Sequence, residues 1–156
     1  AGFKKSFSTR WIRCAGEPLE GGFICSTTLG RLADGREVVV KRCPYPAEVE
    51  ADGLTALAAA GAPVPAVLGV GDRVLVLERV GGPPDWPGLG RAIAALHRRT
   101  GDRFGWHRDN FQGMTVQSNG WSDDWPSFYV ERRVRERPGP GLSRRAFVGA
   151  SRRSFR

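Results

Sequence analysis

Two charged residues, Lys41 and Glu50, have the types and spacing of an ion pair that can serve phosphoryl transfer. Lys41 ends the run Glu37–Lys41, and Glu50 comes nine positions later (50 − 41 = 9). In such a pair the lysine neutralises phosphate oxygens of a nucleotide, and the glutamate holds the lysine in place. The alternative is an ordinary surface lysine and an ordinary surface glutamate. The two residues alone do not distinguish these alternatives, so the neighbouring sequence has to be considered.

Two other stretches could complete a nucleotide site. Gly21 and Gly22 precede Lys41, and backbone N–H groups can approach phosphates closely where no Cβ intervenes. Glu78, Arg79 and Val80 end an apolar run, where backbone groups could hydrogen-bond adenine. Each signal is weak alone, because a glycine pair is most often a plain turn and an apolar run is often a plain edge strand.

The elements that would position these residues predict an α+β fold. Strands are expected on both sides of the glycine pair, within 19–29, and at 37–41, where β-branched residues gather. A helix then carries Glu50, with Val49, Leu54 and Leu57 near one face. Residues 65–70 and 73–80 predict a further hairpin. This order gives a five-stranded antiparallel sheet with one helix packed on it.

The rest of the chain predicts a linker, a second lobe and a tail. Gly81-Gly82-Pro83-Pro84 breaks the sheet, and residues 88–100 read as a helix with His97 on its core-facing side. Residues 101–130 are too aromatic for a disordered linker. The predicted domains are a lead-in at 1–15, a first lobe at 16–80, a hinge at 81–88, part of a second lobe at 89–134 and a disordered basic tail at 135–156.

Composition narrows the class of protein. The 156 residues are 40% hydrophobic and 26% charged, as in ordinary globular domains. No apolar run is long enough for a transmembrane helix, and no secretory signal is recognisable. Cys14, Cys25 and Cys43 form an odd set without CxxC spacing. We therefore expect neither a disulfide framework nor a zinc site, and we expect the protein to reside in the reducing cytoplasm.

The net charge of +8 belongs to the end of the chain. Residues 131–156 hold nine arginines against Glu131 and Glu136, whereas the preceding residues are nearly neutral. A folded basic face for nucleic acid is therefore not expected. A nucleic-acid-binding protein remains an alternative that rests on the tail alone, and salt-sensitive binding lost on deleting 135–156 would favour it.

The chain resembles the N-terminal part of the fructosamine kinase (ketosamine kinase) family, which is related to the aminoglycoside phosphotransferases and the protein-kinase-like fold. The likeness covers roughly residues 16–134, and its most specific part is the aromatic segment after Phe104. The matching strings are GG at 21–22, LADGREVVVK at 32–41, EADGLTAL at 50–57, VPAVLGV at 64–70, LVLE at 75–78, LGRAIAALHRRTGDRFGW at 89–106 and QSNGWSDDWPSFYVERR at 117–133.

The resemblance implies ATP-dependent phosphorylation of a sugar hydroxyl on a ketosamine, and a kinase-like N-lobe followed by the first part of a helical C-lobe. Gly21 and Gly22 would belong to the loop that covers the nucleotide. Lys41 would contact phosphates, Glu50 would orient Lys41, and Glu78, Arg79 and Val80 would form the adenine hinge. Trp106, Asn119 and Trp125 would pack the aromatic segment first and line the substrate side second.

The sequence also departs from the family. The family's catalytic loop has a His-Gly-Asp pattern followed by Asn, and a later Asp binds Mg²⁺; neither pattern occurs here. His107-Arg108-Asp109 falls inside the aromatic segment and is not taken as a catalytic loop. We therefore expect a truncated or frameshifted kinase with no catalytic residue or metal ligand of its own. Which glycated amine the family member uses is not readable from the sequence.

Two functions remain besides nucleic-acid binding. The first is a small-molecule kinase represented by its nucleotide-binding half. The second is a noncatalytic remnant that binds nucleotide weakly or acts through protein contacts, and turnover of a ketosamine would separate the two. A partial C-lobe should leave apolar surface around Trp121, Trp125 and Phe128 exposed, so we expect self-association.

Overall fold

The computed structural model describes residues 12–13, 18–19 and 22–135. They divide into two compact units, one ending at Thr100 and one beginning at Gly101, and each is described by itself. Gly21, most of the lead-in and the tail after Arg135 lie outside the described residues. The sequence-based division at 81–88 stays a prediction. Within the described part, every helix is too short or too polar to cross a membrane.

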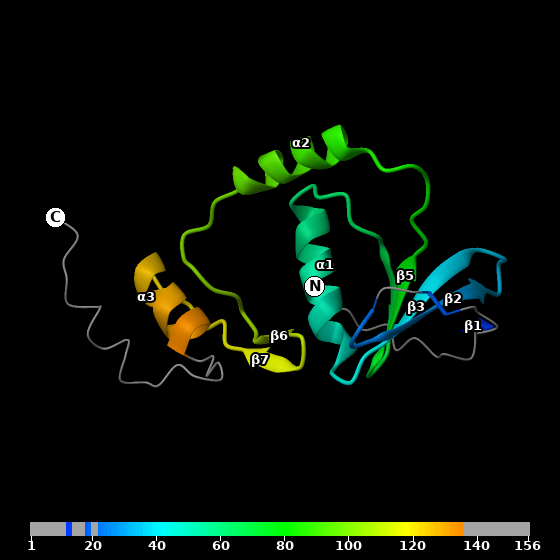
Figure 1. The fold of residues 1–156 in the computed structure, drawn as a ribbon, viewed down its shortest axis with the longest axis horizontal. Coiled ribbons are helices and arrows are strands. Elements are labelled where there is room, and N and C mark those ends of the chain that lie inside the picture. Colours follow the sequence, from blue (N-terminus) through cyan, green and yellow to red (C-terminus); the bar gives the residue numbers. More distant parts are fainter. Residues whose placement is uncertain (1–11, 14–17, 20–21, 136–156) are drawn as a thin grey trace. The chain divides into compact units, whose positions relative to one another are not determined.

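The first unit is built on the predicted antiparallel sheet. Its strands are β1 (Ile12–Arg13), β2 (Ser26–Leu32), β3 (Glu37–Arg42), β4 (Val67–Val70) and β5 (Val74–Glu78). They lie in the order β1-β2-β3-β5-β4, and each neighbouring pair is antiparallel (Figure 1). The α+β class with a kinase-like sheet is confirmed.

The first strand of the sheet is not where the sequence placed it. Leu19 was expected in a strand before the glycine pair; of the residues described there, Pro18 makes a bridge with Thr28, and the Leu19 N–H donates to the Thr27 carbonyl (2.8 Å). The edge position farther along β2 is taken by Ile12–Arg13.

A tight turn joins β2 to β3 at Ala33–Arg36. The Arg36 N–H donates to Asp34 Oδ1 (3.0 Å), and Arg36 Nε donates to Asp34 Oδ2 (2.8 Å). These bonds from Arg36, the backbone bond first, lower the pKa of Asp34. Gly35 has a φ of 89°, which a residue with a Cβ rarely adopts. The turn thus fixes the register of the two strands.

Helix α1 (Ala47–Ala59) packs on one face of the sheet. Its buried residues are Ala47 and Ala51, which join Leu75 and Leu77 of β5, with Leu54 packed against them. Of the predicted apolar face, only Leu54 belongs to this core cluster; Val49 is half-buried and Leu57 is exposed. Small alanine side chains allow the helix backbone to approach the strands closely, so the face they occupy is the one that is buried.

The opposite face of the sheet has its own cluster. Val38 and Val40 of β3 and Val76 of β5 are at most 2% exposed. Val39 packs in the cluster on the α1 side instead. Because side chains alternate along a strand, Lys41 lies on the same side of β3 as Val39, facing α1.

Helix α2 (Trp86–His97) begins at an N-cap, Asp85, whose side chain accepts a hydrogen bond from the Gly88 N–H (2.9 Å). None of its residues is buried. His97, predicted on a core-facing side, is exposed. The helix has an apolar stripe with Trp86, Leu89 and Ile93, and these side chains are exposed in the structure.

The second unit combines a small hairpin with a short helix. The strands are β6 (Asn110–Gln112) and β7 (Thr115–Gln117), followed by α3 (Trp125–Tyr129) and a π-helical stretch, η2 (Val130–Arg135). The hairpin was not predicted, because strands of three residues are too short to give a periodic signal. Gly105 has a φ of 137°, and a Cβ there would lie 2.8 Å from the Asn119 carbonyl oxygen.

Candidate functional site

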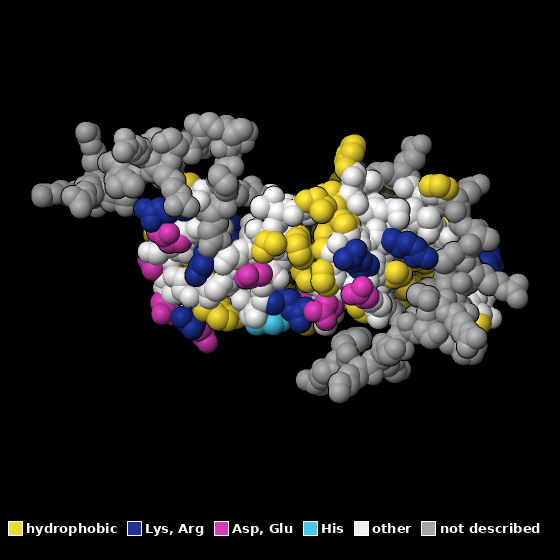
Figure 2. Space-filling model, turned by 90° about the horizontal axis from the view of Figure 1, so that it is seen from below, with side chains coloured by type: hydrophobic (Ala, Val, Ile, Leu, Met, Phe, Trp, Pro, Cys, Tyr) yellow, Lys and Arg dark blue, Asp and Glu magenta, His cyan; other side chains and the backbone are white. Residues whose placement is uncertain are grey.

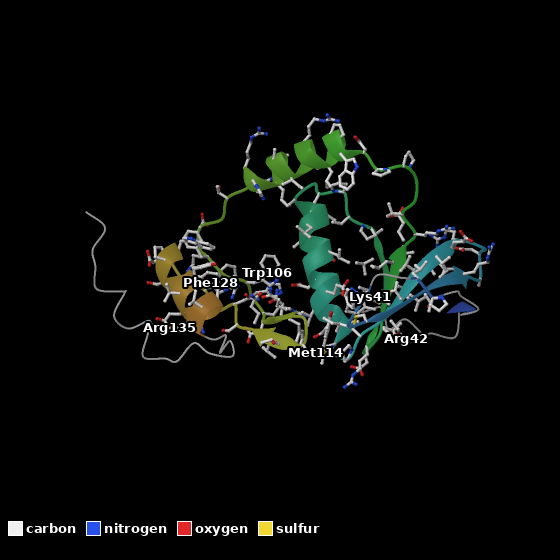
Figure 3. All side chains as sticks on the ribbon, in the orientation of Figure 1. Lys41, Arg42, Trp106, Met114, Phe128 and Arg135 are labelled. Atoms are coloured by element: carbon white, nitrogen blue, oxygen red, sulfur yellow. A yellow bond between two sulfur atoms is a disulfide. The ribbon has the colours of Figure 1, made fainter. Side chains whose placement is uncertain are left out.

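Lys41 reaches the helix side of the sheet from the middle of three strands. It pairs with Thr27 of β2 and with Leu75 of β5, whose side chain is 1% exposed. Leu75 belongs to the core cluster beneath α1. The lysine stem is therefore carried by a strand that is fixed on both edges, and its ammonium extends toward α1 (Figure 3).

Glu50 meets Lys41 from the first turns of α1. Lys41 Nζ lies 2.7 Å from Glu50 Oε1 and 2.8 Å from Oε2, so the ammonium is shared by both carboxylate oxygens. Glu50 is one turn after Ala47 and beside Ala51, on the face that α1 buries. The two side chains are 27% and 26% exposed. The pair thus lies at the edge of the core, with about a quarter of each side chain accessible.

The glycine turn comes just before β2. Gly22 lies where a Cβ would be 2.7 Å from the Cys25 carbonyl oxygen, so only glycine fits this close turn. Phe23 at the turn is fully exposed, with a relative accessibility of 105%, whereas Cys25 is buried. Gly21 lies outside the described residues, so its assignment to a nucleotide-covering loop stays a prediction.

The cysteines correct a sequence-based expectation. Cys25 and Cys43 form a disulfide, with their Cα atoms 4.4 Å apart, although no disulfide was predicted. The reason is strand register: Ser26 pairs with Arg42, so the residues just beyond this pair face each other. A signal was present, because Cys25 and Cys43 are equidistant from Asp34 in the turn. The cysteine argument for a reducing compartment therefore falls, and the cytoplasmic location stays a prediction.

The predicted hinge is tied into the sheet by its side chains. The Ala66 N–H donates to Glu78 Oε2 (3.1 Å), and the Glu78 N–H donates to the Ala66 carbonyl (2.9 Å). Arg79 forms an ion pair with Glu37 at the start of β3. Val80 follows with a 69% exposed side chain. Glu78 and Arg79 thus use their side chains for structure, and a role in binding adenine would fall to backbone groups.

Glu37 is a residue that the sequence reasoning missed. The Glu37 carboxylate forms ion pairs with Arg79 through Oε2 and with Arg31 Nη2 through Oε1 (3.2 Å). It thereby links β2, β3 and the end of β5. The signal for it was weak, because a charged residue at the first position of a strand is common and its partners are distant in sequence.

In the second unit, Asn119 is a structural hub. It is 3% exposed, and its side-chain Nδ2 donates to the Arg108 carbonyl (3.2 Å). Its Oδ1 accepts a hydrogen bond from Arg133. Its backbone N–H donates to Asp109 Oδ1 (2.9 Å), and its carbonyl accepts from the Trp106 N–H (2.8 Å). Asp109 is therefore tied to Asn119 across ten positions of the chain, and its exclusion as a catalytic residue stays a prediction.

The aromatic residues of this unit form a cluster around Trp125. Its ring lies 5.5 Å from those of Phe104 and Tyr129 and 5.8 Å from that of Phe128. Phe128 (Figure 3), expected to be exposed, is buried at 6%, because Arg133 stacks over its ring at 4.7 Å. Trp121 and Trp125 remain about half exposed, at 46% and 50%. A substrate-lining role for Trp106, Asn119 or Trp125 stays a prediction.

Exposed side chains are otherwise mixed in type, and Figure 2 shows apolar groups interspersed with charged ones. Among the described residues, no group of three or more His, Cys, Asp or Glu side chains could hold a metal ion.

Comparisons with known proteins agree on one family. The family model described as fructosamine kinase matches residues 37–137. A protein of Thermus thermophilus assigned as a ketoamine kinase is 38% identical over 121 residues, which are 75% of this chain and 44% of that protein. One of Synechocystis, with the same assignment, is 39% identical over 97 residues, 56% of this chain and 33% of that one.

Solved structures give the same result. A crystal structure from Thermobifida fusca, assigned as a fructosamine-3-kinase, matches with a TM-score of 0.67 at 31% identity, over 77% of this chain and 46% of that one. A second, from Haemophilus somnus, matches with a TM-score of 0.65 at 29% identity, over 76% and 44%. The chain thus spans less than half the length of these relatives.

Proposed function

The chain belongs to the fructosamine kinase family, and from this premise we propose that its first unit binds the phosphates of ATP. The observation that carries the proposal is the pair formed by Lys41 Nζ with both carboxylate oxygens of Glu50, at 2.7 and 2.8 Å. Held by Glu50, the ammonium has a fixed position from which to neutralise phosphate oxygens. Gly21 and Gly22 would let backbone N–H groups approach the same phosphates.

We assign adenine to the backbone of the stretch Glu78, Arg79 and Val80, where the donor would come from Arg79 or Val80 because the Glu78 N–H is bonded to the Ala66 carbonyl (2.9 Å). Three observations support this. The side chain of Glu78 and the charge of Arg79 are already engaged within the sheet, and Val80 is exposed directly after β5. A backbone edge that ends a strand offers a donor and an acceptor at fixed spacing, which suits the flat edge of a base.

For the complete family member we propose ATP-dependent phosphorylation of a sugar hydroxyl on a ketosamine. That reaction also needs a carboxylate beside the acceptor hydroxyl. The 156 residues contain no His-Gly-Asp string, and Asp109 is bonded to the backbone of Asn119. We therefore assign nucleotide binding, without turnover, to these residues. No metal-dependent step is proposed for them.

The experiment is a titration of the purified chain with a fluorescent ATP analogue. Lys41→Ala removes the phosphate contact and should weaken binding at least about 100-fold, since charge-assisted contacts to phosphate are the strong ones. Arg42→Ala is the matched control, because it removes one positive charge from the next residue of the same strand. Equal affinity of Lys41→Ala and wild type would refute the site; a loss shared with Arg42→Ala would reduce the effect to net charge.

Phosphoryl transfer is tested separately. The chain is incubated with ATP and a fructosyl-amine, and sugar phosphate is measured. We expect binding of nucleotide and no product. Product formation would show that the acceptor-activating group lies within these 156 residues.

A further inference from the structure

A row of paired residues crosses the sheet at the level of Lys41. Thr27 of β2 pairs with Lys41, which pairs on its other side with Leu75 of β5. Leu75 pairs in turn with Val70 of β4. Residues that pair directly across antiparallel strands present their side chains on the same face, so this row faces α1. It is apolar where Leu75 and Val70 join the core beneath α1, and polar at Lys41 and Thr27.

The polar end of the row lies beside the glycine turn. The hydroxyl oxygen of Thr27 is 3.7 Å from the position that a Cβ on Gly22 would occupy. The Cβ atoms of a directly opposed strand pair such as Thr27 and Lys41 are about 5 Å apart. Thr27 is half-buried, and none of the residues that the structure describes forms a hydrogen bond with its hydroxyl. The hydroxyl therefore lies next to both the turn and the lysine, with its hydrogen available to a ligand.

We propose that Thr27 is a further phosphate-binding residue, whose hydroxyl donates a hydrogen bond to a phosphate oxygen of the ATP held by Lys41. The inference rests on the proposed nucleotide function and adds a residue to that site. The ammonium neutralises the charge of the phosphates, whereas the short, uncharged hydroxyl directs a single oxygen. The backbone of the glycine turn, the hydroxyl and the ammonium then contact different phosphate oxygens.

Thr28, the next residue of β2, provides a matched comparison because it lies on the other face of the sheet. It pairs with Val40, which is 1% exposed and belongs to the cluster on the face opposite α1. Both threonines are half-buried. Replacing either one by valine removes a hydroxyl and retains a β-branched side chain, which suits a strand. The two substitutions therefore differ in the face from which the hydroxyl is removed.

The experiment measures how well unlabelled ATP and adenosine displace the fluorescent ATP analogue. Thr27→Val should weaken ATP binding about tenfold, because a hydrogen bond to a charged group is lost. Thr27→Ser, which retains the hydroxyl, and Thr28→Val should bind ATP nearly as well as the wild type. Adenosine has no phosphate and should compete equally well in all four proteins, which a purely structural role of Thr27 would not produce. Thermal unfolding without nucleotide checks that each variant folds.

The outcomes separate this inference from the proposed function. Unchanged ATP affinity in Thr27→Val, alongside the loss expected for Lys41→Ala, would overturn the inference and leave the proposed function standing. Equal losses in Thr27→Val and Thr28→Val, or an equal loss of adenosine binding, would assign the effect to the shape of β2 and would also overturn it. A loss in Thr27→Ser as large as in Thr27→Val would exclude the hydroxyl as the contact. Unchanged binding in Lys41→Ala would refute the proposed function, and this inference with it.

Discussion

The Lys41–Glu50 pair and the Asn119 network are both polar clusters, but they differ in what remains open. The charged pair is about a quarter exposed and rests on a buried apolar core. Asn119 is 3% exposed, and both ends of its amide are bonded within the protein. A polar cluster with an accessible side can bind a ligand. A polar cluster whose donors and acceptors are all bonded to other protein groups stabilises the backbone instead.

The family-specific motif is the one whose polar groups are used inside the protein, although a specific motif would be expected to mark the functional site. The aromatic segment with Asn119 is the most family-specific part of the chain, whereas a strand lysine and a helix glutamate occur in many kinases. Yet the contacts of Asn119 are internal, whereas the widely shared pair keeps about a quarter of its side-chain surface exposed. A specific motif can therefore identify a family through its folding requirements.

The largest effect is expected from the core beneath the charged pair. Leu75→Ala should lower the free energy of unfolding of the first unit by about 3 to 4 kcal/mol, because it leaves a cavity next to Lys41 and α1. Urea unfolding measures this. Leu89→Ala on α2 is the control, since its side chain is 41% exposed and should cost under about 0.5 kcal/mol. Equal costs would show that the pair does not rest on this core.

Removing the Asn119 side chain should lower the free energy of unfolding by somewhat less than Leu75→Ala does. Asn119→Ala should destabilise the second unit by about 2 to 3 kcal/mol, because it leaves the Arg108 carbonyl and the Arg133 guanidinium without this partner. Gln112→Ala removes an exposed amide from β6 and serves as the control. The comparison would fail if Asn119→Ala left stability unchanged and instead altered binding of a fructosyl-amine.

A smaller effect is expected from Glu50→Gln. The neutral amide can still hydrogen-bond Lys41 but no longer fixes it by charge, so affinity for ATP should fall about tenfold, or about 1.4 kcal/mol. Calorimetry at constant salt measures this. Glu48→Gln on the same helix is the control for net charge. Tighter binding by Glu50→Gln would mean that the glutamate competes with phosphate for the lysine.

The smallest effect concerns the start of α3. The Ser127 hydroxyl and N–H lower the pKa of Asp124 below 3.8, because they favour the charged carboxylate. Its contribution to stability is therefore present above pH 3.8 and is lost as the pH falls through the lower folded pKa. Thermal unfolding measured at several acidic pH values should show a smaller loss of stability with falling pH for Asp124→Asn than for the wild type. Identical profiles for both proteins would exclude a contribution from the charge.

The sequence predicted those parts of the site whose signals are local. The β-branched run at 37–41 and the helix expected after it were enough to predict that Lys41 and Glu50 could pair, because each residue lies within one locally recognisable element. The buried face of α1 was misjudged, because Ala47 and Ala51 carry less hydrophobic signal than Val49 and Leu57. Small side chains are favoured on a helix face that packs closely against strands, because they allow the two backbones to approach.

Other features depend on register or on distant partners. The Cys25–Cys43 disulfide follows from the pairing of Ser26 with Arg42, which a cysteine count does not contain. The ion pairs of Glu37 join residues far apart in sequence. Burial of Phe128 depends on Arg133 stacking over it, a contact that apolar patterning does not report.

The edge strand β4 has a consequence for association between copies of the chain. Its four residues carry an irregularity between Val67 and Gly69, where the register with β5 shifts. A short, bulged edge is a poor template for a strand from another molecule, because its free backbone groups no longer repeat at the spacing of a ladder. Continuous sheets across molecules are thereby disfavoured along β4.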